Sequence, residues 1–132
     1  MIALVETAEG VVSVDLEDET VLTVDPGAAL EAPPQVSVGL PRVVAAVGSG
    51  STVVCLVDAR PPLLVSHDTG RTWRESGRGL PRGRAIAVSD DDPDLQLYAA
   101  EDRLYLSTDG GRFWRGLAVE LEGIEAVAFP AG

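Results

Sequence analysis

The sequence predicts an all-β protein made of antiparallel hairpins, and three observations lead to this fold class. The apolar residues form short, often Val-rich runs with almost no helical periodicity. The segments between the runs are rich in Gly, Pro, Asp and Ser, which favour turns. The pattern of runs and turns also repeats along the chain. We therefore expect thirteen strands, at residues 2–5, 11–16, 21–24, 36–38, 43–47, 53–57, 63–65, 72–74, 85–88, 95–99, 104–106, 113–117 and 124–129.

The repeat groups these strands, in chain order, into three units of four and one surplus strand. The octet SHDTGRTW at 66–73 returns 41 residues later as STDGGRFW at 107–114, and the apolar strand that opens each unit returns with it. A degenerate copy of the octet begins at Thr23 and keeps Asp25 and Gly27. The predicted units are 1–41, 42–83 and 84–122, and the surplus strand lies within 123–132.

Charge and cysteine content exclude several classes of partner and location. The 132 residues include 10 basic and 21 acidic side chains, which gives a net charge of -11. Because nucleic-acid binding needs clustered positive charge, we expect no nucleic-acid partner. The single cysteine, Cys55, excludes an intrachain disulfide. The N-terminus lacks a basic signal region, and no apolar run reaches the ~20 residues of a membrane helix. We therefore expect a cytoplasmic protein without membrane contact.

The octets resemble the Asp-box, or BNR repeat, of β-propellers such as sialidases, sortilin-type receptors and photosystem II assembly factors. The pattern is S-x-D-x-G-x-T-W, and the second octet departs from it only in having Phe113 at the Thr position. The resemblance implies propeller blades of four antiparallel strands, with structural boxes at the blade periphery. The residues it assigns to this role are Ser66, Asp68, Gly70, Thr72, Trp73, Ser107, Asp109, Gly111 and Trp114, with Thr23, Asp25 and Gly27 as the degenerate copy.

The chemistry of the octet is that of a hairpin turn. A glycine at position 70 or 111 supplies positive φ at low cost, and the preceding carboxylate can accept hydrogen bonds from turn amides. The Trp that ends the octet can bury a large ring between neighbouring sheets. Ser66, His67 and Asp68 are adjacent, so their side chains alternate between faces and cannot form a nucleophilic relay. We expect no catalytic residue here.

Three blades cannot close into a ring, because propellers use four to eight. We therefore expect a half propeller that dimerises into a six-bladed ring. The surplus strand at 124–129 would then clasp the partner's first blade in trans. Two alternatives are a fragment of a longer propeller and another closed oligomer. If residues 1–5 are instead the second strand of their blade, residues 20–38 must hold an irregular last strand, and the box at Asp25 is a coincidence.

Other polar groups have simpler structural explanations. Asp90–Asp94 is expected to be a solvated turn rather than a calcium site, because the Gly and distal Glu of an EF-hand are missing. Cys55 is expected to be a small buried residue, His67 an exposed turn residue, and the two tyrosines, Tyr98 and Tyr105, packing residues. The local arginines are expected to pair with surrounding acids; they are Arg71, Arg74, Arg78, Arg82 and Arg84. We expect no metal and no cofactor.

The function that these observations favour is a non-enzymatic, self-assembling binding or scaffold module. It would present a ring face or central funnel to a protein or small polar ligand. The alternative is a glycan-binding or glycoside-hydrolysing, sialidase-like propeller that is active only as an oligomer. The Arg triad, Tyr and Glu of sialidases match no motif in this sequence. A third interpretation, an assembly factor of the photosystem II type, predicts co-purification with a larger complex.

Overall fold

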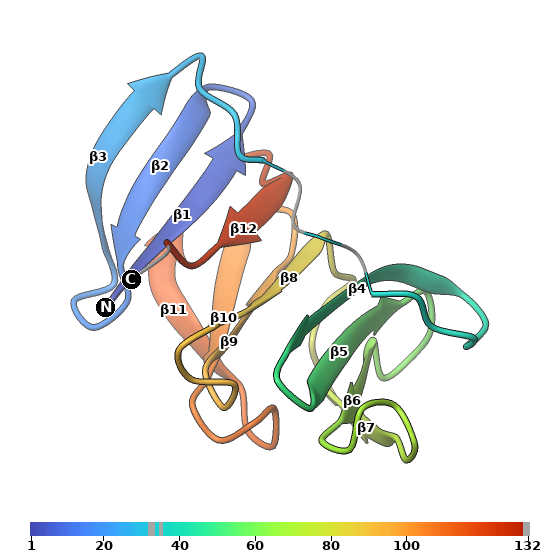
Figure 1. The fold of residues 1–132 in the computed structure, drawn as a ribbon. Coiled ribbons are helices and arrows are strands. Elements are labelled where there is room, and N and C mark those ends of the chain that lie inside the picture. Colours follow the sequence, from blue (N-terminus) through green and yellow to red (C-terminus); the bar gives the residue numbers. More distant parts are fainter. Residues whose placement is uncertain (32–33, 35, 131–132) are drawn as a thin grey trace.

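The structure is a computed structural model that describes residues 1–31, 34 and 36–130. In this part of the chain there are twelve strands and no helix, so no helix spans a membrane (Figure 1). The strands are β1 (Ile2–Thr7), β2 (Gly10–Asp15), β3 (Thr20–Pro26), β4 (Val43–Ser49), β5 (Thr52–Val57), β6 (Leu63–Ser66), β7 (Arg74–Ser76), β8 (Ala85–Val88), β9 (Gln96–Ala99), β10 (Arg103–Ser107), β11 (Arg115–Glu120) and β12 (Ala126–Ala128).

The strands form three four-stranded antiparallel sheets, which confirms the all-β class and the number of four-stranded units. Sheet A has the order β12-β1-β2-β3, sheet B the order β4-β5-β6-β7 and sheet C the order β8-β9-β10-β11. Sheets B and C are each built from consecutive strands joined by hairpins. Sheet A combines the first three strands of the chain with its last one.

The C-terminal strand pairs within its own chain. Val127 lies opposite Val5, and the backbone N–H of Glu125 donates to the Glu6 carbonyl at 2.9 Å. β1 is therefore the second strand of its sheet, and β3 is the last. The pairing that we expected across a dimer is made in cis here. Residues 131–132 of the surplus segment, and residues 32, 33 and 35 of the expected first unit, lie outside the described residues.

Three predicted strands differ in the structure for identifiable reasons. The strand expected at 113–117 begins later, at Arg115, because Phe113 still belongs to the octet turn of sheet C. Residues 36–38 are extended but belong to no sheet, and their hydrogen bond to sheet B runs from the Val36 N–H to the Ala46 carbonyl at 3.0 Å. The strand expected at 72–74 begins later, at Arg74, because Thr72 still belongs to the octet turn. Turn hydrogen bonds therefore set the start of β7.

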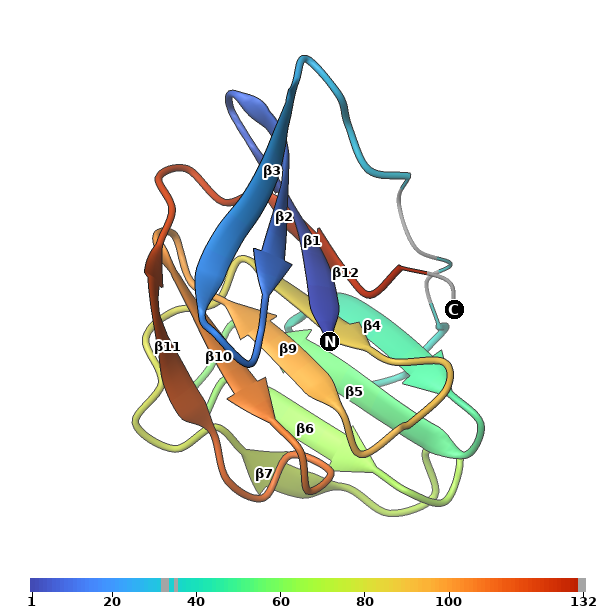
Figure 2. The same cartoon turned by 90° about the vertical axis from the view of Figure 1, so that its left-hand side faces the viewer.

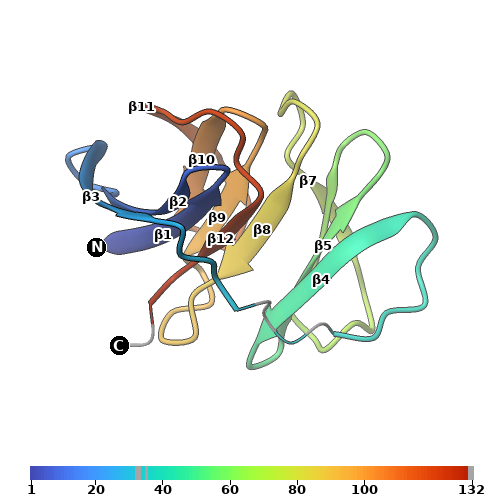
Figure 3. The same ribbon diagram turned by 90° about the horizontal axis from the view of Figure 1, so that it is seen from above.

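Sheet C lies between sheets A and B, so the order in space is A, C, B (Figures 1 and 3). The first strand of sheet C, β8, contacts both β4 and β12, the first strands of the other two sheets. Figure 2 shows sheet A standing against sheet C, with β3 at the outer edge. The described strands of sheets A and B do not contact each other.

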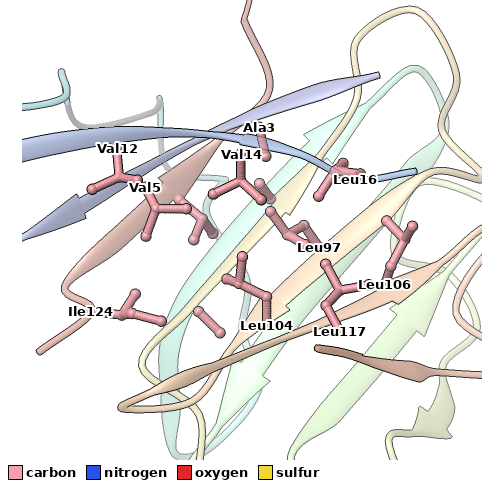
Figure 4. Packing of buried hydrophobic residues seen from close by; sticks show 13 residues of the cluster. Ala3, Val5, Val12, Val14, Leu16, Leu97, Leu104, Leu106, Leu117 and Ile124 are labelled. Carbon is pink, nitrogen blue, oxygen red and sulfur yellow. The ribbon is translucent and has the colours of Figure 1, made fainter. Parts of the chain in front are cut away.

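Alternate residues of each strand point to opposite faces, and this alternation divides the core into three clusters. The A–C cluster includes Val5 and Val14 from sheet A and Leu97 and Leu104 from sheet C (Figure 4). The remaining fully or largely buried members of the A–C cluster are Ala3, Val12, Leu16, Ala87, Ala99, Leu106, Leu117, Ile124 and Val127. Sheet C therefore uses one whole face to bury sheet A.

The other two clusters lie on the two faces of sheet B. The B–C cluster joins this sheet to sheet C and contains Val47, Val54, Leu56, Leu63, Val65, Ile86 and Tyr98. The outer cluster covers the opposite face and contains Ala46, Val53, Cys55 and Val57. Val36, Val38 and Leu40, from the segment that joins sheet A to sheet B, pack on this outer cluster.

The C-terminal segment should be essential to the fold, and Ile124→Ala tests this. Ile124 is fully buried in the A–C cluster, so the cavity left by the variant should lower the free energy of unfolding by about 2–5 kcal/mol. Glu125→Ala, an exposed neighbour, should change it by less than about 0.5 kcal/mol. Urea unfolding followed by tryptophan fluorescence gives both values. Equal effects would mean that the C-terminal segment is not integrated into the core.

Candidate functional site

The octet of sheet B forms a turn in which Asp68 is the central acceptor. The Ser66 hydroxyl donates to Asp68 Oδ1 at 2.7 Å. The backbone N–H groups of Arg71 and Thr72 donate to the same oxygen at 3.1 and 2.9 Å, and the Thr72 hydroxyl donates to Oδ2 at 2.6 Å. Gly70 has a φ of 87° and donates its N–H to Ser66 Oγ at 2.8 Å. Every polar group of the octet pattern is thus used inside the turn.

The octet of sheet C repeats this geometry with one bond missing. The Ser107 hydroxyl donates to Asp109 Oδ1 at 2.8 Å, and the N–H groups of Arg112 and Phe113 donate to it at 3.1 and 3.0 Å. Gly111, at φ 87°, donates its N–H to Ser107 Oγ at 2.9 Å. Phe113 has no hydroxyl to offer to the second carboxylate oxygen, and its ring is 78% exposed.

These hydrogen bonds stabilise the charged form of both carboxylates. The pKa of Asp68 is lowered chiefly by the side chain and backbone N–H of Thr72 and also by Ser66. The pKa of Asp109 is lowered chiefly by the Phe113 N–H, against a smaller effect of burial. Both groups are therefore fixed anions at neutral pH, suited to holding a turn rather than to exchanging protons.

The degenerate copy of the octet lies elsewhere in its sheet. Thr23 and Asp25 are inside β3, where the Thr23 hydroxyl donates to Ser13 Oγ at 2.9 Å, and Gly27 follows the strand with a φ of 76°. The turn before the last strand of sheet A is formed instead around Asp15.

Asp15 makes the turn bonds that the degenerate copy was expected to make. Its Oδ1 accepts the N–H groups of Glu17 and Asp18 at 2.9 and 3.0 Å. The pKa of Asp15 is lowered by these two donors, Asp18 first. The octet pattern missed Asp15, although an Asp near the end of an apolar run and two residues before the polar stretch 17–20 is a usable signal.

The two octet tryptophans occupy different interfaces. Trp114 packs on the B–C cluster, donates its indole N–H to Ser76 Oγ at 3.0 Å, and contacts Tyr98 edge-to-face at a centroid distance of 6.0 Å. The Ser76 hydroxyl in turn donates to the Gly111 carbonyl of sheet C. Trp73, its counterpart in sheet B, packs on the outer cluster under residues 36–40. Ser76 was not among the predicted residues because nothing in the octet pattern points to it.

The triplet at residues 66–68 is engaged in structure. The Ser66 hydroxyl proton is donated to Asp68, and the His67 Nδ1 lies 3.2 Å from Thr52 Oγ1. His67 contributes to the contact between the β4–β5 turn and the octet, where the Thr69 N–H donates to the Ser51 carbonyl at 2.9 Å. No Ser–His hydrogen bond exists among these described residues.

The acidic loop and the cysteine also take part in local structure. Within Asp90–Asp94, Ser89 Oγ accepts the Asp91 and Asp92 N–H groups, and Asp92 Oδ1 accepts the Asp94 N–H at 3.1 Å. Across residues 1–31, 34 and 36–130, no group of three or more His, Cys, Asp or Glu is arranged to hold a metal ion. Cys55 is buried, and burial raises the pKa of its thiol.

The arginines do not form one patch. Arg82 and Arg84 join Arg60 around a cavity of about 780 Å³ between sheets B and C, at the ends of the sheets where the 77–84 connector lies. Arg82 lies 3.5 Å from Asp58, and Arg84 lies 3.9 Å from Glu101. Because all four side chains are at least half exposed, these pairs add little stability. The cavity is lined by these three arginines together with Asp58 and Glu101.

Comparison with known proteins found no protein-family model that matches the chain and no curated protein similar to it in sequence.

The Asp68 carboxylate should stabilise the fold at neutral pH but not in acid, and Asp68→Asn tests this. Because its pKa in the folded state lies below the ordinary 3.8, its contribution is complete above about pH 4 and is lost as the pH falls further. Urea unfolding should show a deficit of the variant at pH 7 that shrinks towards pH 2. Asp25→Asn, near the end of β3, should change stability by less than about 0.5 kcal/mol. A deficit of equal size at both pH values would contradict the assignment.

The second octet lacks the threonine hydroxyl because Phe113 stands at that position, and a substitution should be able to restore the missing hydrogen bond. Phe113→Thr places a donor beside the second oxygen of Asp109 and removes an exposed ring, so it should raise the free energy of unfolding by about 0.5 kcal/mol. Thr72→Val makes the opposite change in the first octet and should lower it. Thermal unfolding of the two variants measures both signs. A loss of stability in Phe113→Thr would show that the two turns are not equivalent.

Proposed function

We propose that this protein is a non-enzymatic scaffold module of the Asp-box propeller type. Sheets A, B and C are three blades, and two copies of the chain assemble into a six-bladed ring. One observation carries the proposal. Sheet C is covered on both faces by other sheets, whereas sheets A and B each have a face that no other described sheet covers. An array of repeats buries its apolar surface only against neighbouring repeats, so its two ends need partners.

The arrangement of the strands supports this proposal. In a propeller the first strand of every blade lies nearest the axis. Here β4, β8 and β12 are the first strands of their sheets, and β8 lies beside both β4 and β12. The pairing of β12 with β1 completes sheet A within one chain. A ring of two copies would therefore be joined by contacts between sheet faces rather than by exchanged strands. A two-fold axis would make the two joints identical.

A scaffold role agrees with the chemistry of the octets. Their serines, aspartates and glycines are engaged in turn bonds, and both carboxylates remain charged at neutral pH. A ring of two copies would present the cavity at Arg82 and Arg84 twice, related by the axis. That duplication suits the display of a binding surface to a protein partner.

A second candidate function, recognition of an acidic glycan, is favoured by the arginine-lined cavity. A carboxylate-bearing sugar could replace Asp58 or Glu101 in pairs that are already exposed and long. A glycan array and a hydrolysis screen discriminate between the two functions. Binding of acidic sugars that is lost in Arg84→Ala would favour this candidate, and hydrolysis would argue against a scaffold.

The mass in solution tests the proposed ring. Light scattering should show a rise from one chain to two with protein concentration and nothing larger. Each copy carries a charge of -11, so raising the salt from about 0.05 to 0.5 M should favour the dimer by screening the repulsion between copies. A mass of one chain at every concentration and salt, or an open series of larger species, would contradict the ring.

A further inference from the structure

The uncovered face of sheet A follows the residue pattern of the two sheet faces that are already packed. On the first strands, Ala45 of sheet B packs on the B–C cluster and Ala85 of sheet C packs on the A–C cluster. Ala126 holds the corresponding place on β12 but packs in none of the clusters. The face of sheet A that lacks a neighbouring sheet thus begins with the same small residue.

The second strands extend this correspondence, whereas the third strand of sheet A, β2, carries Ser13 and Asp15 beside Val11 on that face. In β5, Leu56 faces sheet C, and in β9, Leu97 faces sheet A, each packed in a cluster. In β1 the residues that alternate with buried Ala3, Val5 and Thr7 are Ile2, Leu4 and Glu6, and Glu6 Oε1 accepts the Leu30 N–H at 2.7 Å. Ile2 is 43% exposed and Leu4 is half-buried, although both are large apolar residues on a strand. The pattern therefore equips sheet A for a further sheet beyond it.

The matching surface is the outer cluster of sheet B, and a short segment of the same chain lies over it. Residues 36–40 form this segment, which we call the strap. Val36, Val38 and Leu40 are half-buried against the cluster, whereas Ser37 and Gly39 are exposed, so the strap covers the sheet with alternate side chains. Figure 3 shows the chain running along the outside of β4 before it enters that strand.

The strap does not fill all the space over this face. A cavity of about 310 Å³ remains between it and the octet turn, and Val53 and Trp73 are part of the lining. At the B–C contact the equivalent octet residue, Trp114, packs between two sheets and donates a hydrogen bond to Ser76 of the neighbouring sheet. Trp73 has only the strap beside it on this face.

The connector sequences indicate which part of the strap belongs there permanently. Leu80-Pro81 precedes sheet C, and Leu80 packs on the B–C cluster, between the preceding sheet and the next. Leu40-Pro41 precedes sheet B in the same way, and Leu40 packs on the outer cluster. By this correspondence Leu40 marks the place where a preceding sheet packs. Val36 and Val38 align with Ser76 and Arg78, which are not members of the B–C cluster.

We propose that the sheet A face of a second copy docks on the outer cluster of sheet B and that the strap competes with it for this surface. The proposal rests on the proposed ring and adds its docking surface and its regulation. Each copy would offer sheet A to its partner's sheet B, so two straps must leave for the ring to close. Any preference of the strap for its closed position then weakens the dimer twice over.

Val38→Asp tests the strap, with Ser37→Asp as a matched control. Each variant adds one negative charge, and the two positions are adjacent in the chain. Only Val38→Asp places the charge against the apolar outer cluster. Cys55, the only thiol in the chain, lies in that cluster and reports on opening. At concentrations low enough to keep the protein monomeric, Val38→Asp should speed alkylation of Cys55. At higher concentrations it should tighten the dimer dissociation constant by about tenfold or more, whereas Ser37→Asp should leave both quantities near wild type.

Leu4→Asp identifies the other side of the contact. Added to Val38→Asp, it should return the protein to a monomer while Cys55 stays reactive, because it changes sheet A and not the strap. Val44→Asp, an exposed apolar residue of β4 that packs in none of the clusters, should leave the dimer intact. The comparison of Leu4→Asp with Val44→Asp also distinguishes specific docking of sheet A from nonspecific association through an outer cluster that the strap has left exposed.

The outcomes distinguish the two proposals. If Val38→Asp opens Cys55 but the protein stays monomeric, the docking surface is refuted. If wild type and Val38→Asp dimerise equally and Leu4→Asp has no effect, the ring survives and this inference fails. If no variant dimerises under any condition, both proposals fail. Dimers that form in Val38→Asp and are abolished by Leu4→Asp support both.

Discussion

Sheets B and C of this protein carry apolar side chains on both faces, and both faces of each are covered in the structure. The requirement for cover on both faces follows from the alternation of strand residues. In β5, for example, Val54 and Leu56 point to one side while Val53, Cys55 and Val57 point to the other, and all five are buried. A sheet that is apolar on one side only is satisfied by one neighbour, whereas these sheets need two. The position of sheet C between A and B, and the strap over sheet B, are consequences of this requirement.

The octet turns contribute to the same packing, because they fix where one strand ends and where the tryptophan after the turn lies. Asp68 and Asp109 gather the turn amides, and this lets the chain reverse within a few residues. The indole that follows is then delivered to the space beside the sheet. In sheet C it meets Tyr98 and Ser76 from two different sheets. The hydrogen bonds of the turn join residues that are close in sequence. They nevertheless affect the contact between sheets, because they position the tryptophan, the largest side chain of the unit.

Much of the fold was accessible from the sequence, and so was the geometry of the octets. Apolar runs and turn residues are local signals, which is why ten of the twelve observed strands lie close to their predicted positions. β11 was displaced because Phe113 was needed by the octet turn of sheet C. β7 was displaced because Thr72 was needed by the turn. The degenerate copy at Asp25 shows the limit of pattern matching, since an Asp and a Gly at the right spacing lie in and after a strand there. Asp15 took the turn position because it stands where the hairpin reverses, and only the strand pairing shows that.

By itself, the sequence determined the all-β class, the number of four-stranded units and the residues of the two octets. These features depend on contacts between residues that are close along the chain, such as Asp68 with Thr72. The tertiary structure decided that β12 joins β1, that sheet C lies in the middle, that three arginines meet at one cavity and that residues 36–40 cover sheet B. Those outcomes depend on which apolar faces meet. Residues as distant as Val5 and Val127 show this, because their pairing comes from the burial of a shared face and not from their separation in the chain.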